Sequence, residues 1–322
     1  MTASLVTIGI TAFNCAGTVE KAIWSALFQT WRPIEIVVVD DLSTDETREI
    51  LAQLAAKHPE LRVFQNKSNR GVAVSRNHIL SKARGEFVAF FDDDHESLPE
   101  RIAEQMKRIL EYERDFSSGA PVICYAARKV LYQDGSMHVQ GTMGQREGQR
   151  APNGLAVAER VLLGNPLEDG YGACPTCSQM ARLSSYRDAG GFDPAFRRSE
   201  DSELNVRWAK MGGHFIGIKK PLVIQRMTKT SDKSLTDERR YMLLLLKKHK
   251  DIPDKYGMYD FCQRWIDIKY AWLGADRSAF VTNLIRIIVS YPWLTLRRLA
   301  LSLPNIGLNR AFSIFHLNEY LK

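Results

Sequence analysis

The amino-acid sequence predicts an α/β fold built on a Rossmann-like, mostly parallel sheet with helices on both faces. Short apolar and β-branched runs alternate with helix-type patterns over about 110 residues, which is typical of a doubly wound sheet. The runs at 34–39 and 86–91 end in adjacent aspartates, Asp40-Asp41 and Asp92-Asp93-Asp94. Open α/β sheets bind ligands at the carboxyl ends of their strands, so we expect these aspartates to share one edge.

The elements of the first hundred residues follow from local patterns. The expected strands are 5–10, 34–39, 62–64 and 86–91, and the expected helices are 19–32, 43–58 and 72–83. Side-chain caps are expected at Thr18, at the Ser43 to Glu46 box and at the Ser97 to Glu100 box. Gly85 is expected to end the third helix.

The second half changes character. Strands are expected at 122–130, 137–139, 172–183, 214–218 and 222–224, with a turn at Asp134-Gly135. A helix capped by Ser199 should begin with Glu200 and Asp201 and stop at Gly212. Residues 141–155 are rich in Gly, Gln and Arg without a clear period, which predicts a mobile loop near the site.

A C-terminal helical extension is expected after about residue 232, so we divide the chain into a catalytic domain (1–232) and a helical region (233–322). From residue 219 onward the sequence has 19 Lys and Arg against 9 Asp and Glu, whereas the first 218 residues have 25 against 28. Apolar faces at 279–290 and 293–303 carry flanking arginines, and the uncharged runs there, such as 287–296, are too short to span a membrane. These helices are expected either to lie on an anionic membrane surface or to pack on the catalytic domain.

Composition sets further limits. A chain with 322 residues, 45% of them hydrophobic and 25% charged, is globular. No nucleic-acid-binding motif accompanies the basic residues, so nucleic acid is not an expected partner. Five cysteines and the absence of a basic leader before the first strand favour the cytoplasm. The Cys174-x-x-Cys177 spacing lacks a second pair for zinc, so these are expected to be structural thiols.

The aspartate triple is the strongest chemical signal. Carboxylates crowded at a strand end repel one another unless a cation compensates, and oxygen ligands suit Mg²⁺ or Mn²⁺. An acidic helix N-terminus without a ligand is the alternative for one such cluster. Three clusters, including Glu200-Asp201, are difficult to explain by capping alone. They are consistent with group transfer from a diphosphate-activated donor, with a carboxylate taking the acceptor's proton. His95 could add a metal ligand or only line the site.

The order of motifs resembles the family 2 glycosyltransferases with the GT-A fold. Thr11-Ala12-Phe13-Asn14, the stretch 36–45 and the stretch 69–77 are similar to the family's opening segments. Phe91-Asp92-Asp93-Asp94 is similar to its D-x-D position, Gly190-Gly191-Phe192-Asp193 to its Gly-Gly-Phe-Asp segment, and Ser199-Glu200-Asp201 to its E-D motif. The resemblance covers residues 4–225. Phe13 departs from the commoner tyrosine, and Cys15-Ala16 stands where acidic or polar residues are frequent.

The resemblance implies a role for each matching position. The implied nucleotide-binding residues are Thr11, Phe13, Asn14, Asp40, Asp41, Arg76, Asp92 and Asp93. Asp94 would be the principal ligand of Mn²⁺ or Mg²⁺, with Asp92 as the outer carboxylate. Asp201 would be the general base, assisted by Glu200.

The activity that the resemblance implies is metal-assisted transfer of a hexose or N-acetylhexosamine, with inversion, from a UDP-sugar to a glycan or polyprenyl-linked acceptor. The expected pathway is the synthesis of a bacterial cell-surface polysaccharide or lipopolysaccharide. The Q-x-x-R-W segment of processive synthases is missing from the sequence, which favours a non-processive enzyme. A nucleotidyltransferase is the alternative enzyme, but the loop Asn14-Cys15-Ala16-Gly17-Thr18 lacks the basic residue it would need. A non-catalytic nucleotide-sugar-binding module is the other alternative.

Overall fold

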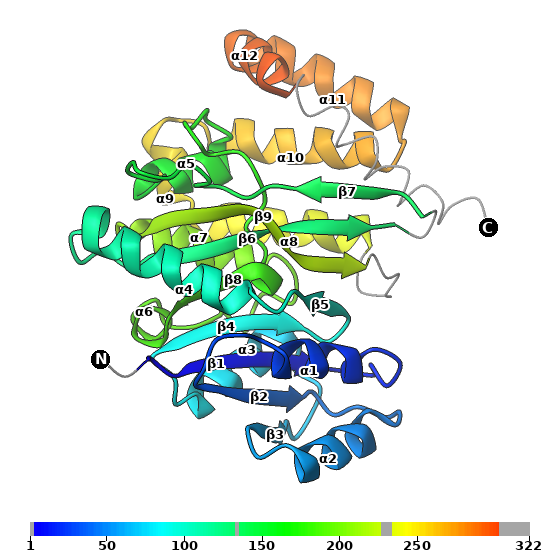
Figure 1. Ribbon diagram of the computed structural model, residues 1–322. Helices are drawn as coiled ribbons and strands as arrows, with labels where there is room; N and C mark the ends of the chain where they lie inside the picture. The colour runs from blue at the N-terminus through cyan, green and yellow to red at the C-terminus, as the bar shows by residue number, and fades with distance from the viewer. Residues whose placement is uncertain (1–2, 133–134, 227–233, 303–322) are drawn as a thin grey trace. The chain divides into compact units, whose positions relative to one another are not determined.

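A computed structural model describes residues 3–132, 135–226 and 234–302. The chain forms two compact units (Figure 1). The first comprises residues 1–158 and 167–228, and the second comprises 159–166 and 229–322. The expected boundary at 232/233 lies among residues 227–233, outside the described residues. The sequence patterns did not assign residues 159–166 to the C-terminal unit.

The first unit is built on a nine-stranded mixed sheet with the order β3-β2-β1-β4-β8-β6-β9-β5, and β7 pairs with β6. Its strands are β1 Val6–Ala12, β2 Ile34–Asp40, β3 Leu61–Gln65, β4 Phe87–Asp92, β5 His95–Ser97, β6 Val122–Leu131, β7 Met137–Gln140, β8 Gln179–Arg182 and β9 His214–Arg226. The strands β1, β2, β3, β4, β6 and β9 run in one direction, and β5, β7 and β8 run in the other.

Helices cover both faces of this sheet, as the sequence predicts. The helices are α1 Val19–Leu27, α2 Thr47–Lys57, α3 Val72–Lys82, α4 Arg101–Tyr112, α5 Leu155–Leu163, α6 Leu183–Asp188 and α7 Glu200–Lys210. Side chains alternate between faces along a strand. Ile8, Ile36 and Ala89 therefore share a core with α1, α2 and α4. Phe90 points to the other face, where its ring contacts Tyr186 of α6.

The caps expected from sequence are not made by side chains. Thr18, Glu46, Glu100 and Ser199 occupy the residue before their helices, and none makes a side-chain cap. The Ser43 hydroxyl instead donates to the Asp40 carboxylate at 2.5 Å. Ser97, the last residue of β5, accepts from the Arg101 guanidinium at 2.8 Å. The capping-box predictions were wrong because these hydroxyls bind other side chains, Asp40 and Arg101, instead of the helix N–H groups. Short polar side chains favour helix starts and turns alike.

Other local predictions also change. Gly85 has no positive φ and does not end α3, whose cap is Ala83. A Cβ at Gly85 would lie 2.5 Å from the Thr7 backbone nitrogen, so glycine allows close approach to β1. Helix α5 forms within the region 141–172, to which no helix was assigned, and the two short strands expected after 214 are one strand, β9. Asp134 of the expected turn falls in a part of the chain that is not described.

The second unit is helical. It contains α8 Leu235–Lys248, α9 Asp251–Lys255, α10 Tyr259–Leu273, α11 Arg277–Ser290 and α12 Pro292–Ser302, together with residues 159–166. Two side-chain caps do form here. The Ser234 hydroxyl oxygen accepts from the Asp237 N–H, and the Asp276 carboxylate accepts from the Ala279 N–H. Residues 303–322 lie outside the described ranges, so the expected helix 293–303 is seen to Ser302. Among the described helices, none is long and apolar enough to cross a membrane.

Candidate functional site

Three parallel strands bring the predicted acidic residues to one edge of the sheet. Ala12 of β1 lies opposite Asp40 of β2, and Thr11 lies opposite Asp92 of β4. The residues that follow each strand, including Asp41 and Asp93, therefore begin loops at the same edge. This register confirms that the two aspartate clusters lie at the same edge of the sheet, on the strands at either side of β1.

The loop after β1 is tied to its surroundings through its own backbone. Four consecutive N–H groups, at 13–16, donate to side-chain oxygens. The acceptors are Asp93, Ser43, Thr47 and Asp45, in that order, at 3.3, 2.9, 2.8 and 3.1 Å. These N–H groups are therefore already paired. The loop does not offer them to a phosphate in the way that a Gly-rich phosphate loop does.

Phe13 and Asn14 take different positions in that loop. The Phe13 side chain is 45% exposed and presents its ring beside the aspartate cluster, one residue after β1. Asn14 has a positive φ of 48°, and its amide oxygen accepts from the Thr44 backbone at 2.8 Å. An open aromatic ring held on a fixed loop can stack against a planar ligand.

Asp40 and Asp41 organise the loop after β2. Asp40 is buried and accepts from Gln65 at 2.9 Å, in addition to Ser43. Asp41 is also buried and accepts from the Asn66 amide at 2.7 Å and from the Gly71 backbone at 2.8 Å. Protein donors thus occupy part of the capacity of both carboxylates. A nucleoside contact by either residue stays a prediction.

The aspartates after β4 are in unequal environments. The Asp93 carboxylate turns back toward the Phe13 N–H. Burial, reinforced by the charge of Asp94, raises the pKa of Asp93 to about 7. Burial also raises the pKa of the nearby Cys15 thiol, and Asp93 adds to that effect. The side chains of Asp92 and Asp94 are 28% and 22% exposed, so an ion from solvent can reach both.

Arg76 of α3 connects the aspartate triple to the E-D motif. Its side chain is only 6% exposed, and its guanidinium lies 2.5 Å from Glu200 and 3.5 Å from Asp92. The same group lies over the Phe192 ring, with 5.3 Å to the centroid. Burial disfavours its charge, but Glu200 and Asp92 outweigh that effect and raise the pKa of Arg76. One buried cation therefore holds residues 92 and 200 together.

The turn before α7 fixes the approach of that helix. Asn77 donates to the Phe192 carbonyl at 2.7 Å and accepts from the Phe192 N–H at 2.8 Å. A Cβ at Gly191, which has a φ of +68°, would lie 2.5 Å from the Asn77 amide oxygen. Arg207 of α7 donates to the Gly191 carbonyl at 2.7 Å. The Gly-Gly-Phe-Asp segment therefore joins α3 to α7.

Asp201 follows Glu200 in the first turn of α7. Its side chain accepts from the Ser202 backbone at 2.6 Å. Burial raises the pKa of Asp201 to about 6, and the charge of neighbouring Glu200 adds to the shift. Arg76 and Arg198 act in the opposite direction. A carboxylate with a pKa near neutrality accepts a proton more readily than an ordinary aspartate does.

The donor set near the triple fits a divalent cation. Asp92, His95 and Cys177 each bring one possible ligand atom to within 4.8 Å of the others. His95 also contacts Asp94 through its Nδ1. Burial disfavours the charged ring, but hydrogen bonds to Asp94 and Cys177 raise the pKa of His95 well above its usual value. A proton and a metal ion compete for an imidazole nitrogen, so uptake by this ring requires loss of the proton.

Cys177 is a potential ligand that the sequence patterns missed. It was assigned to a structural pair with Cys174, because C-x-x-C suggested only zinc or redox chemistry. The structure places Cys177 in the turn Thr176–Ser178 before β8, which pairs with β4. That antiparallel pairing, between strands separated by about 90 residues in sequence, brings the thiol close to Asp92 at the end of β4. That Asp94 and Asp92 are the metal ligands stays a prediction.

Taken together, this edge of the sheet can hold a cation, present an aromatic ring and remove a proton. Two exposed carboxylates and an imidazole surround the end of β4, Phe13 lies next to them, and Asp201 is linked to them through Glu200 and Arg76. These are the parts required to transfer a group from an anionic donor to a hydroxyl.

Residues 7–159 match the family described as Glycosyl transferase family 2. The chain is 30% identical over 203 residues to the putative glycosyltransferase EpsE of Bacillus subtilis (strain 168), covering 62% of this chain and 65% of EpsE. It is 37% identical over 114 residues to the UDP-Glc:alpha-D-GlcNAc-diphosphoundecaprenol beta-1,3-glucosyltransferase WfaP of Escherichia coli, covering 35% of this chain and 44% of WfaP. The matches thus span less than two thirds of either relative.

The fold is also found in a solved structure. The crystal structure of S. aureus TarS 1–349 in complex with UDP-GlcNAc matches with a TM-score of 0.55 and 18% identity. The similarity covers 97% of this chain and 89% of that one, so it extends through the C-terminal helices. At this identity the likeness concerns the fold alone.

The GT-A fold expected from the sequence is therefore confirmed. The family match includes β1 to β4 and the Asp92-Asp93-Asp94 triple. Residues 7–159 of this chain therefore carry a match to glycosyl transferase family 2 that includes its first four strands.

Proposed function

We propose that the chain transfers a single sugar from a UDP-sugar to a hydroxyl of a lipid-linked or glycan acceptor, in the synthesis of a bacterial cell-surface polysaccharide. The observation that carries this proposal is the link Asp92–Arg76–Glu200, which brings the D-x-D strand and the E-D helix to one site. WfaP, a relative by sequence, is named for a UDP-glucose donor and a diphosphoundecaprenol acceptor. The TarS structure contains UDP-GlcNAc.

The donor would bind across the loops that follow β1 and β2. The uracil would stack on the exposed Phe13 ring, with Thr11, Asn14 and Asp41 around the nucleoside. Asp40 would keep the second loop in place through Ser43 and Gln65. Arg76, which is buried and paired with Asp92 and Glu200, would act on the diphosphate as a positive charge below the site. Asp93 would shape the loop that faces the donor through its contact with the Phe13 N–H.

Asp201 would activate the acceptor. Its carboxylate takes the proton of the acceptor hydroxyl while that oxygen forms a bond to the anomeric carbon. The bond from this carbon to the diphosphate breaks on the opposite face, and UDP leaves with the bonding electrons. In-line attack of this kind inverts the anomeric configuration. Glu200, bonded to Arg76, assists by holding the first turn of α7 in place.

A divalent cation, Mn²⁺ or Mg²⁺, would be held by Asp94 and Asp92 with His95 beside them. When bound, it supplies positive charge for the leaving diphosphate. The carboxylate oxygens and the imidazole are ligand types that Mn²⁺ accepts, whereas the Cys177 thiol is a softer ligand.

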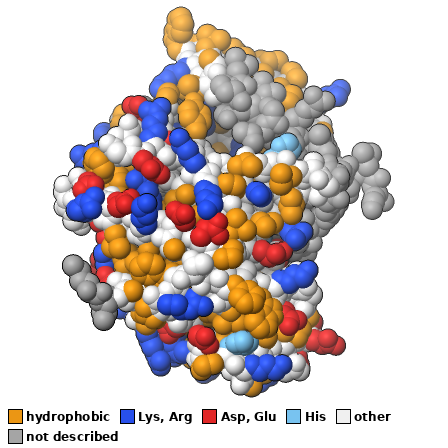
Figure 2. All heavy atoms as spheres, viewed as in Figure 1, with side chains coloured by type: hydrophobic (Ala, Val, Ile, Leu, Met, Phe, Trp, Pro, Cys, Tyr) orange, Lys and Arg blue, Asp and Glu red, His pale blue; other side chains and the backbone are white. Residues whose placement is uncertain are grey.

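We further propose that α11 and α12 hold the enzyme on the inner face of the cell membrane. Large apolar side chains on these helices are exposed: Val281, Ile285, Ile288, Val289, Trp293, Leu296 and Leu299. Trp293 is 82% exposed and Val289 is 77% exposed. Figure 2 shows hydrophobic side chains gathered over the part of the chain that Figure 1 labels α11 and α12. Apolar residues flanked by Arg286 and Arg297 suit an anionic lipid surface.

Asp201→Asn tests the base. We expect transfer to fall by about 10²- to 10⁴-fold, because the amide cannot take the proton, while UDP-sugar affinity is retained. The wild-type rate should fall as pH drops through about 6, because only the ionised Asp201 is active. The variant should lack this limb of the pH profile. The control is Asp188→Asn on the exposed surface of α6. Unchanged turnover in Asp201→Asn would exclude Asp201 as the general base. If the wild type bound a UDP-sugar but transferred no sugar, the chain would be a non-catalytic binding module.

Asp94→Ala tests the metal. Transfer and UDP affinity by the wild type should both require Mn²⁺ or Mg²⁺, because the leaving diphosphate needs a compensating charge. The variant should bind UDP weakly whether or not the ion is present. Isothermal titration with UDP, in Mn²⁺ and in chelator, measures this difference. Full activity in chelator would show that no such ion is needed.

The double variant Val289→Ser/Trp293→Ala tests membrane binding. Both side chains are exposed, so the fold should not change, and co-sedimentation with anionic phospholipid vesicles should weaken at least about tenfold. Tyr171→Ala, which removes an exposed aromatic ring from the first unit, should bind vesicles as the wild type does. If the double variant and the wild type sediment equally, these helices do not carry the membrane contact.

A further inference from the structure

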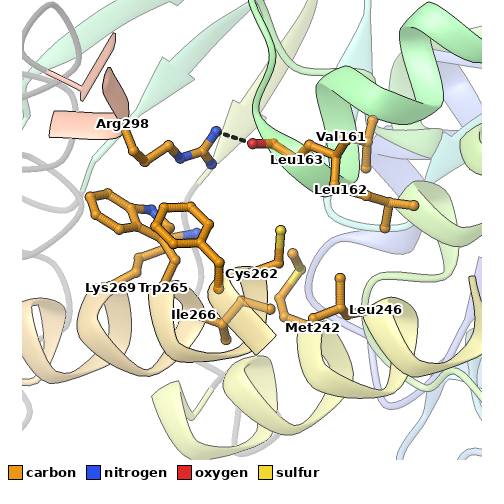
Figure 3. A pocket seen from close by; sticks show the side chains of 11 residues that line it. Val161, Leu162, Leu163, Met242, Leu246, Cys262, Trp265, Ile266, Lys269 and Arg298 are labelled. Carbon is orange, nitrogen blue, oxygen red and sulfur yellow. Dashed lines mark hydrogen bonds between the residues drawn. The ribbon is translucent and has the colours of Figure 1, made fainter. Parts of the chain in front are cut away.

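The second unit contains a cavity that the transfer chemistry does not use. It has a volume of about 140 Å³ and lies between α8, α10, α12 and the segment 161–163 (Figure 3). Its lining residues are Val161, Leu162, Leu163, Met242, Leu246, Phe261, Cys262, Trp265, Ile266, Lys269 and Arg298. All of them belong to the second unit.

The cavity has an apolar end and a cationic end. Leu162, Met242, Leu246 and Cys262 line one side, whereas Arg298 and Lys269 lie with Trp265 on the other (Figure 3). Leu246 and Cys262 are buried, at 2% and 5% exposure. An apolar cavity of about 150 Å³ is large enough for benzene, so this one can hold about five or six carbon atoms.

The two cations differ in the charges near them: the Glu238 carboxylate favours the charge of Lys269, whereas Arg160 and Arg297 disfavour the charge of Arg298. Arg298 donates to the Leu163 carbonyl at 2.6 Å and lies over the Trp265 ring, with 5.7 Å to the centroid. Gly164 makes this contact possible, because a Cβ there would overlap the guanidinium. Burial, together with the charges of Arg160 and Arg297, lowers the pKa of Arg298, so its charge is poorly compensated, whereas Lys269 lies at the exposed rim of the cavity. An anionic group at this end would supply the missing charge.

We infer that this cavity binds the first isoprene unit of the lipid-linked acceptor, with the acceptor's diphosphate on Arg298 and Lys269. The inference rests on the proposed function for the nature of the acceptor. A single isoprene unit matches the size of the apolar end, and a diphosphate matches the pair of cations beside it. The second unit thereby binds the lipid portion of the acceptor, independently of the residues that bind UDP.

Isothermal titration with geranyl diphosphate, in chelator, tests the inference on the full chain. Chelator prevents the metal-dependent nucleotide site from binding the diphosphate. We expect geranyl diphosphate to bind at least tenfold more tightly than inorganic diphosphate, because only the former fills the apolar end. Equal affinities would overturn the inference. Octanoate that bound as tightly as geranyl diphosphate would overturn it too, because the cavity would then be a site for fatty acyl chains.

Two variants locate the binding. Lys269→Gln should weaken geranyl diphosphate at least tenfold, whereas Arg264→Gln should not, because Arg264 is on the same helix but pairs with Asp260 outside the cavity. Cys262→Phe fills the apolar end and should bring the affinities for geranyl and inorganic diphosphate together, provided that its circular dichroism matches the wild type. Wild-type affinity in both Lys269→Gln and Cys262→Phe would place the ligand elsewhere. UDP affinity in Mn²⁺ should be unchanged in all three variants. If the wild type itself did not bind UDP in Mn²⁺, that result would count against the proposed function and not against the lipid site.

Discussion

The structure of the site depends on one buried cation. Arg76 lies beneath the carboxyl edge of the sheet and contacts Asp92 of β4 and Glu200 of α7, which are separated by more than one hundred residues in sequence. Removing either partner from such a group leaves an uncompensated buried charge, which typically costs about 3–5 kcal/mol. The ion pairs therefore fix the spacing between the aspartate strand and the helix that carries Asp201. Phe90 and Phe192 complete the environment from the apolar side.

Crowding of carboxylates is the physical cost of this arrangement. Asp92, Glu200 and Asp201 favour the charge of Arg76, while burial and neighbouring carboxylates raise the pKa values of Asp93 and Asp201. A bound cation would relieve the repulsion within the triple, and an acceptor proton would relieve it at Asp201. The crowding of these carboxylates thus favours the two events that the proposed group transfer requires.

Periodicity and composition predicted much of this from the sequence. The four parallel strands, the helices on both faces and the meeting of Asp40, Asp41 and Asp92 at one edge follow from buried β-branched runs that end in acid. The caps could not be predicted, because a hydroxyl such as that of Ser43 has competing partners: here it donates to the nearby Asp40 and accepts from the Asn14 N–H, which the tertiary fold brings near. Cys177 was missed for the same reason, since only the pairing of β8 with β4 brings it to His95. Residues 159–166 gave no sign in the sequence of joining the C-terminal helices.

The two units divide the proposed work. The first contains the segment that matches family 2, with the loops proposed to face the nucleotide. The second has apolar helices, basic residues and a cavity with two cations. A sugar donor that is soluble and an acceptor that is anchored in lipid require such a division, because the two substrates differ so strongly in polarity. The charge balance of the sequence shows the same division, with the basic excess confined to the residues after 218.

The most direct test of the account is a double-mutant cycle on the free energy of unfolding, with Arg76→Met and Glu200→Gln made singly and together. If Arg76 joins β4 to α7, the two changes should be coupled by about 1–3 kcal/mol, with Arg76→Met the more harmful because it also leaves Asp92 without its partner. Additive effects, within about 0.5 kcal/mol, would contradict the claim that this arginine holds the site together.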